Sequence, residues 1–200
     1  GLLVGKITSR SPFDGYTDPE KNKSVILKDV FTKGDSYFNT GDLVRDIGFR
    51  HAQFVDRLGD TFRWKGENVS TTEVENMVSE YEKIAEAVVY GVEIPNTNGR
   101  AGMAAITLTD GAELNDNDLT EMVSVFKKCL PAYAIPVFLR VQAKVETTGT
   151  FKYQKNKLKE DAFDPSKTDE RLLVLLPGAT SYCDVNAEIF ENIQAYQYRF

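Results

Sequence analysis

Two segments in the first third of the chain combine residue types that could bind a nucleotide. Thr40-Gly41-Asp42 places a carboxylate at the exit of a glycine turn, and a fixed carboxylate can accept hydrogen bonds from both hydroxyls of a ribose. Asp56-Arg57 offers a guanidinium fork, which suits a phosphate or a ribose. Each segment also has an ordinary interpretation, because such turns are common and exposed ion pairs contribute little. The residues alone leave both interpretations open.

Two later segments could present lysines to a ligand. Residues 64–68 (Trp-Lys-Gly-Glu-Asn) place a cation beside a glycine, whose backbone freedom permits an unusual turn or a close approach. Residues 148–155 form a Gly/Thr-rich segment that is expected to lead into a helix, with Lys152 just before the helix begins. Lysine commonly contacts phosphates. The alternatives are a structural turn and a basic helix start on a solvated face. The phosphate-loop pattern GxxxxGK[ST] is absent from the sequence.

The composition excludes several classes of function. The 200 residues are 42% hydrophobic and 27% charged, as in an ordinary globular protein. A net charge of −6 argues against non-specific nucleic-acid binding. The one histidine, His51, has no partner for a metal site or a catalytic triad, so we expect it to be structural or solvated. Cys129 and Cys183 lack a paired spacing, which predicts free thiols in a reducing compartment.

The first part of the chain reads as a small β element. Residues 2–7 already have a strand pattern, and residues 11–19 are rich in turn formers. Apolar spacing predicts a short helix over 22–31. Short strands and tight turns then follow, over residues 37–38, 42–47 and 49–56.

The pattern changes after residues 58–60. Ser70 and Glu73 have the spacing of a capping box, which predicts a helix to about residue 81. Further strands are predicted over 85–92, 102–109 and 137–141, and further helices over 114–130 and 153–163. A last strand begins at residue 171 and precedes an aromatic-rich helix. This alternation predicts an α+β layer domain, with a boundary near Gly59.

The four segments, in this order, resemble the motifs of the adenylate-forming superfamily, which includes acyl-CoA synthetases, firefly luciferase and peptide-synthetase adenylation domains. Two further matches are Glu73-Val74-Glu75 and the Leu-Pro-Ala-Tyr-Ala-Ile-Pro run at residues 130–136. The sequences of residues 59–75 and 148–152 are similar to those of the very-long-chain acyl-CoA synthetase and fatty acid transport protein branch. The resemblance covers nearly the whole chain and weakens after about Asp169.

The resemblance implies roles in acid activation for three residues. Asp42 would bind the ribose hydroxyls of ATP and of the acyl-adenylate, and Arg57 would contact ribose or phosphate. Lys152 would be catalytic, reaching the carboxylate and the α-phosphate where charge develops during adenylation. ATP would be bound with Mg²⁺, and no metal-binding residues are expected in this chain.

The resemblance also implies a CoA channel and a hinge. Lys65, Gly66 and Glu67 match the segment that lines the pantetheine channel. The hinge is expected at Gly59 or Asp60, where most of the superfamily has Asp or Lys and this chain has glycine followed by aspartate. Glycine has the widest backbone freedom, so a pivot there is physically sensible.

We therefore expect an α+β C-terminal portion of a long- or very-long-chain fatty acid–CoA ligase. Residues 1–59 would end the large AMP-binding domain, residues 60–165 would form the lid, and residues 166–200 would be a strand–helix tail packed on it. The fragment alone would be inactive, because the missing N-terminal domain would hold the phosphate loop and the fatty-acid tunnel.

Two alternatives stay open: a non-catalytic binding or transport-coupling module, and a ligase for another carboxylic acid. The expected partners are fatty acid, ATP and CoA, without nucleic acid, in the cytoplasm or on the cytoplasmic face of a membrane. The tail aromatics Tyr196, Tyr198 and Phe200 could pack on the lid or touch a membrane. Homo-oligomer formation also stays open.

Overall fold

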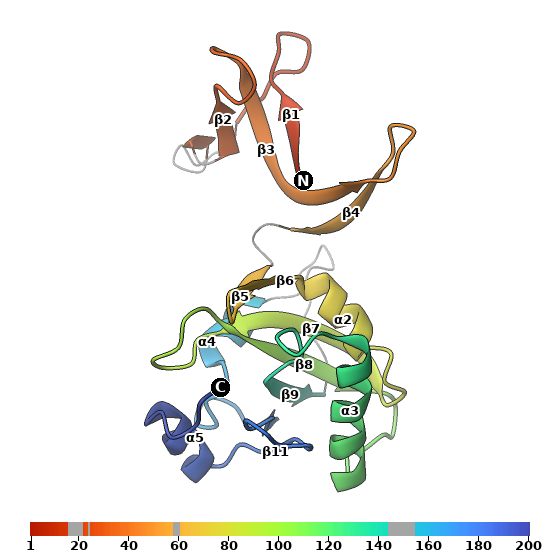
Figure 1. Ribbon diagram of the computed structural model, residues 1–200, viewed down its shortest axis with the longest axis vertical. Coiled ribbons are helices and arrows are strands. Elements are labelled where there is room, and N and C mark those ends of the chain that lie inside the picture. Colours follow the sequence, from red (N-terminus) through yellow and green to blue (C-terminus); the bar gives the residue numbers. More distant parts are fainter. Residues whose placement is uncertain (16–21, 24, 58–60, 144–154) are drawn as a thin grey trace. The chain divides into compact units, whose positions relative to one another are not determined.

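A computed structural model describes residues 1–15, 22, 23, 25–57, 61–143 and 155–200 of the chain. The chain divides into two compact units, Gly1–Gly59 and Asp60–Phe200. Figure 1 labels helices and strands of the two units. Within the described residues, no helix has both the length and the apolar character needed to cross a bilayer.

Unit 1 is an antiparallel sheet built around one long strand. β3 (Ser36–Asp46) pairs with β1 (Leu2–Lys6), β2 (Ile26–Lys28) and β4 (Ala52–Arg57). The helix expected over 22–31 is wrong in its second half, because Ile26–Lys28 hydrogen-bond to β3 as a strand. The two strands expected over 37–38 and 42–47 are one continuous strand.

Thr40-Gly41-Asp42 lies inside β3, so the turn expected there is also wrong. Gly41 has a φ of 76°, a backbone conformation that glycine adopts without steric cost. The Gly41 amide donates to Asn39 Oδ1 at 2.9 Å, and the Asp42 amide donates to Thr40 Oγ1 at 3.1 Å. These local hydrogen bonds make a kink in the strand, immediately before Asp42.

The β3–β4 connection is a turn rather than the start of a strand. Gly48, Phe49 and Arg50 all have positive φ, and β4 begins only at Ala52. Phe49 is 96% exposed, and Ile47 and Phe54 are also exposed. The turn therefore presents bulky apolar side chains outward within this unit.

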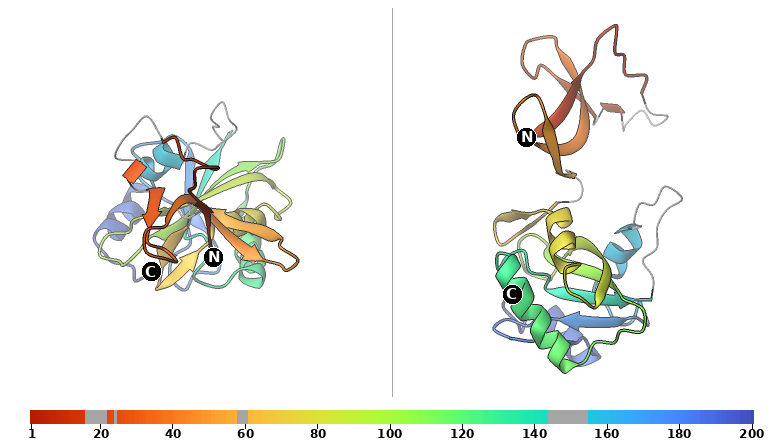
Figure 2. Two further views of the ribbon diagram at one scale, coloured as in Figure 1. Left: turned by 90° about the horizontal axis from the view of Figure 1, so that it is seen from above. Right: turned by 90° about the vertical axis from the view of Figure 1, so that its right-hand side faces the viewer.

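Unit 2 contains a mixed five-stranded sheet in the order β11-β10-β9-β8-β7. Its strands are β7 (Ile84–Val92), β8 (Ala101–Leu108), β9 (Phe138–Gln142), β10 (Arg171–Val174) and β11 (Cys183–Asp184). Its helices are α2 (Thr71–Val78), α3 (Asp116–Cys129), α4 (Lys155–Asp161) and α5 (Ala187–Gln194). α3 and α4 lie on opposite sides of the sheet (Figure 2). The α+β class predicted from the sequence is confirmed.

The helices of unit 2 begin and pack as their sequence patterns predict. Ser70 caps α2 by accepting a hydrogen bond from the Glu73 amide at 3.2 Å. On α3 a capping box joins Asn115 and Asp118. The apolar stripe of α3 is buried; it consists of Leu119, Met122, Val123 and Phe126.

The last thirty residues complete the sheet and its core. β10 pairs with β9, so this segment is part of unit 2 rather than an appended tail. The ring of Phe138 on β9 stacks on the ring of Phe163, with centroids 4.2 Å apart. The ring of Phe200 also lies near Phe138, with centroids 6.1 Å apart. Tyr198 and Phe200 pack against this core, while Tyr196 is exposed.

Candidate functional site

In unit 1, the two residues predicted to contact the nucleotide sugar occupy paired positions. The antiparallel register of β3 and β4 sets Asp42 opposite Arg57. Asp42 is half-buried and directly follows the Gly41 kink. Positions opposite each other in an antiparallel pair have their Cα atoms roughly 4.5–5.5 Å apart. The fold thus brings together two segments that the sequence shows separately.

In unit 2, Lys65 and Gly66 form the turn of a tight hairpin between β5 (Phe62–Trp64) and β6 (Glu67–Val69). Their φ values are 51° and 88°. Positive φ at both residues is typical of the two-residue loops that join the strands of β-hairpins. Lys65 Nζ lies 5.8 Å from the centroid of the Trp64 ring. Because Trp64 is buried and Lys65 is exposed, the hairpin fixes the backbone and leaves the ammonium group accessible.

The hairpin is fastened to the loop between β7 and β8. The Arg100 amide donates to the Arg63 carbonyl at 2.7 Å, and Trp64 forms a β-bridge with Gly99. A Cβ atom on Gly99 would lie 2.2 Å from the Arg63 carbonyl oxygen. Only glycine can therefore occupy this position without displacing the hairpin.

A cavity of about 300 Å³ lies beside this hairpin. Its walls are mainly apolar and include Trp64 and Phe200, and its lining carries the cations Lys65, Lys127 and Arg199. Its described lining contains no Asp or Glu side chain. No ion pair in the described part of the chain engages these three cations. A cavity with this lining suits a ligand that carries several negative charges next to an apolar surface.

Several predicted site residues lie outside the described residues. They are Gly59 and Asp60 at the expected hinge, and Lys152 in the Gly/Thr-rich loop. Lys155 follows that loop and is the first residue of α4. Its ammonium group donates to Glu75 Oε1 on α2 at 3.1 Å.

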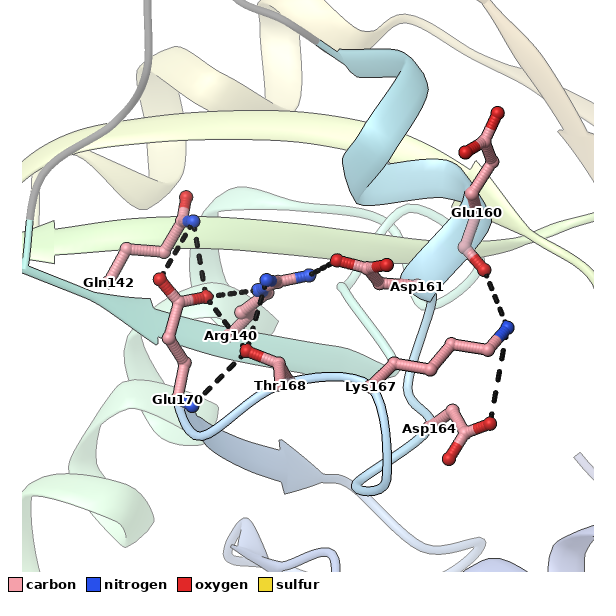
Figure 3. Close-up of polar contacts among 8 residues, drawn as sticks. All are labelled: Arg140, Gln142, Glu160, Asp161, Asp164, Lys167, Thr168 and Glu170. Carbon is pink, nitrogen blue, oxygen red and sulfur yellow. Dashed lines mark hydrogen bonds and ion pairs between the residues drawn. The ribbon is translucent and has the colours of Figure 1, made fainter.

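A buried arginine on β9 secures the other end of α4 (Figure 3). Arg140 is 4% exposed; its Nη1 donates to Asp161 Oδ2 at 3.1 Å and its Nη2 to Thr168 Oγ1 at 3.1 Å. Its Nε donates to Glu170, which also accepts a hydrogen bond from the side-chain Nε2 of Gln142 at 3.1 Å. Burial alone would lower the pKa of Arg140, but the hydrogen bonds that it donates to Glu170 and Asp161 outweigh burial, and the pKa is raised.

Sequence reasoning missed this network and the two additional cations of the cavity. A signal for Arg140 exists, because it is a lone charge in the strand sequence Phe-Leu-Arg-Val-Gln, and a buried arginine requires partners. No comparable sequence signal marks Lys127 or Arg199 as cavity residues. Lys127 belongs to α3 and Arg199 to the end of the chain, so only the fold brings them to the same cavity.

The described residues contain no group of three His, Cys, Asp or Glu side chains that could hold a metal ion. His51 is exposed, and both cysteines are free thiols, as predicted. A magnesium ion bound with ATP is held mostly by phosphate and water oxygens, so it requires no such group.

Residues 73–152 match the family model of the AMP-binding enzyme C-terminal domain. The chain is 46% identical over 196 residues to long-chain fatty acid transport protein 6 of Mus musculus, covering 98% of this chain and 31% of that protein. It is 45% identical over 193 residues to the medium/long-chain-fatty-acid–CoA ligase FadD6 of Mycobacterium tuberculosis, covering 96% of this chain and 32% of that protein. The chain spans about a third of the length of these relatives.

Solved structures share the fold. The amide bond synthetase McbA from Marinactinospora thermotolerans matches with a TM-score of 0.60 at 25% identity, over 79% of this chain and 31% of that one. ATP-bound MatB from Rhodopseudomonas palustris matches with a TM-score of 0.64 at 23% identity, over 82% of this chain and 31% of that one. The chain belongs to the adenylate-forming superfamily and contains its AMP-binding C-terminal domain. Within that superfamily it groups with the long-chain fatty acid transport proteins and the FadD6 ligase.

Proposed function

We propose that this chain is the C-terminal portion of a long- or very-long-chain fatty acid–CoA ligase. The full-length protein would convert ATP and fatty acid to acyl-AMP and pyrophosphate, and then convert acyl-AMP and CoA to acyl-CoA and AMP. The observation that carries this proposal is the similarity over nearly the entire chain to FadD6, whose name is that of a medium/long-chain-fatty-acid–CoA ligase. The chain alone would be inactive, since it spans about a third of that ligase.

In the first step, unit 1 would hold the nucleotide. Asp42 would accept hydrogen bonds from the ribose hydroxyls, and Arg57 would contact ribose or phosphate. Their opposed positions on β3 and β4 support a shared task. Lys152 would bring a positive charge to the carboxylate and α-phosphate, where negative charge is redistributed during adenylation.

In the second step, the β5–β6 hairpin of unit 2 would line the path of CoA. Lys65, Gly66 and Glu67 would flank the pantetheine arm. The neighbouring cavity supports this assignment, because its cations Lys65, Lys127 and Arg199 suit the phosphates of CoA and its apolar walls suit a base or a methyl-rich arm. These side chains bind and orient the thiol carrier.

A rotation about Gly59 or Asp60 would connect the two steps. Residues 1–59 would belong to the large AMP-binding domain, and unit 2 would be the lid that presents Lys152 first and the hairpin second. Closure motions of this kind gate many enzymes. Peripheral contact with a cytoplasmic membrane surface would give the full-length protein access to fatty acid, and the name of the mouse relative favours such a setting.

The identity of the acid is the main alternative within this proposal. The chain is also 42% identical over 193 residues to isopenicillin N epimerase component 1 of Hapsidospora chrysogena, over 91% of this chain and 32% of that protein. That name is not one of a fatty acid transporter, which favours ligation of another carboxylic acid as the second candidate. Comparing palmitate with aromatic and branched acids in pyrophosphate release would separate the two.

The decisive test of the proposal is Lys152→Ala in the full-length protein. Acyl-AMP formation should fall by about 10²-fold or more, because a preorganised charge at the reacting group is lost. Thioester formation from supplied acyl-AMP should persist. Pyrophosphate release and thioester formation measure the two steps separately. Lys157→Ala, at an exposed position of α4, serves as the control, and equal loss of both steps in Lys152→Ala would overturn the assignment.

A further inference from the structure

Helix α4 is held at both ends by ion pairs to elements distant in the sequence. At its first residue, Lys155 Nζ lies 3.1 Å from Glu75 Oε1 on α2, a partner 80 residues away. At its last residue, Asp161 Oδ2 lies 3.1 Å from Arg140 Nη1 on β9. Figure 3 shows this second pair beneath the helix. The two pairs fix the ends of one short element.

The helix needs such anchors. It has seven residues, of which Leu158 is the one that is buried. Isolated helices shorter than about 12 residues are marginal in water. Its placement therefore depends on its tertiary contacts, which include the buried leucine and the two ion pairs.

The anchor at the first residue is itself rigid. Glu75 Oε1 also accepts the Val89 amide of β7 at 2.8 Å, so the carboxylate is tied to the sheet. The side chains of Lys155 and Glu75 are only 16% and 18% exposed. A pair shielded to this degree holds its geometry better than an exposed one, because water competes less for both charges.

We propose that Glu75 and Lys155 are positioning residues for adenylation, which set the direction in which the chain enters α4 and thereby the reach of Lys152. The inference rests on the proposed function of Lys152. That lysine precedes Lys155 by three residues, so three peptide units join it to this anchor. A displacement of about 1 Å at a reacting group can cost 10²-fold in rate.

The test separates the two half-reactions in the full-length protein. Glu75→Gln keeps an oxygen that can accept the Val89 amide and removes the charge that attracts Lys155. We expect acyl-AMP formation to fall about tenfold in kcat, with the KM for ATP little changed. Thioester formation from supplied acyl-AMP should stay within about twofold of the parent protein.

Variants at the other partner sharpen the assignment. Lys155→Met should reproduce the loss, while Lys155→Arg, which retains a charge able to reach Glu75, should restore most of the activity. Combining Glu75→Gln with Lys155→Met should be no worse than either change alone, because both remove one interaction. Additive losses in the double variant would overturn the coupling.

A matched control is Lys83→Met, which removes another partly shielded pair, Lys83 Nζ to Asp118 Oδ1 at 2.8 Å, in the same unit. It should lower stability and leave the ratio of the two half-reactions unchanged. If Glu75→Gln only shifts the melting temperature in the same way, the positioning role fails. Lys152→Ala, measured in parallel, separates failure of the positioning role from failure of the proposed function. If Lys152→Ala still forms acyl-AMP, the proposed function fails as well. If Lys152→Ala loses that step and Glu75→Gln does not, only the positioning role fails.

Discussion

The two units of the chain differ in what they bury. Among the described residues, every buried apolar side chain belongs to unit 2, beginning at Phe62. Unit 1 leaves Phe31, Phe49 and Phe54 between 54% and 96% exposed. A β-sheet becomes stable when a second layer covers one of its faces. Unit 2 supplies that layer from its own helices, whereas the described residues of unit 1 form hydrogen-bonded strands without a buried apolar core.

The largest expected difference appears when the units are separated. Residues 60–200 expressed alone should unfold in one cooperative transition, since they retain the whole buried core. Residues 1–59 alone should show none, because their strands have too little apolar surface to bury. Thermal unfolding followed by circular dichroism checks both pieces. A cooperative transition in 1–59 would show that the sheet is stable without a second layer.

A smaller effect is expected from paired phenylalanine substitutions in the 200-residue chain. Phe126→Ala, at a side chain that is 0% exposed, should lower the unfolding free energy by about 3–5 kcal/mol through lost burial and a new cavity. Phe49→Ala, at a side chain that is 96% exposed, should change it by about 0.5 kcal/mol or less. Urea unfolding followed by circular dichroism reports on both units, and the fluorescence of the single tryptophan, Trp64, reports on unit 2. Similar costs at both sites would contradict the contrast in burial.

The smallest effect concerns acid sensitivity. A hydrogen bond from Lys83, with help from the Asn115 amide, lowers the pKa of Asp118 below its ordinary value of 3.8. A carboxyl whose pKa is lower when folded stabilises the fold above its unfolded pKa and loses this contribution as pH falls through its folded pKa. Asp118→Asn should therefore destabilise unit 2 most near pH 7, and the difference should shrink as pH drops below about 4. Tryptophan-monitored urea unfolding across this range measures it.

Unit 1 provides the control for that pH dependence. Although burial opposes the change, backbone amides of Thr32, Phe31 and Val30 lower the pKa of Asp35. Because Asp35 belongs to the other unit, Asp35→Asn should leave the pH profile of the Trp64 signal unchanged. An equal change from both variants would mean that the two units unfold together.

The same contrast explains what the sequence could predict. In unit 2 the strands β7 to β9 and helix α3 were predicted within a few residues, because long apolar periodicities and helix caps are local signals. In unit 1 the predicted helix over 22–31 fails in its second half, because Ile26–Lys28 pair with β3. Such pairing depends on a partner that a local pattern does not identify.

The candidate site divides in a similar way. The turn at Lys65-Gly66 could be predicted, since glycine and spacing are local. The opposition of Asp42 and Arg57 required the register of two strands. The Arg140 network required three partners that lie 21 to 30 residues away. Local sequence identifies candidate chemical groups, but pairing in space decides which of them act together.

The missing side chain of Gly99 has a consequence for timing. It allows the hairpin to lie directly on the β7–β8 loop, so the Lys65 turn is tied to unit 2. Helix α4 is likewise tied to that unit through Glu75 and Arg140. In the proposed rotation the two working faces would therefore be mutually exclusive: when one enters the reaction chamber, the other must leave it. The order of the two half-reactions would then follow from the rotation of one rigid domain between two orientations, one for each half-reaction. No additional signal would be needed.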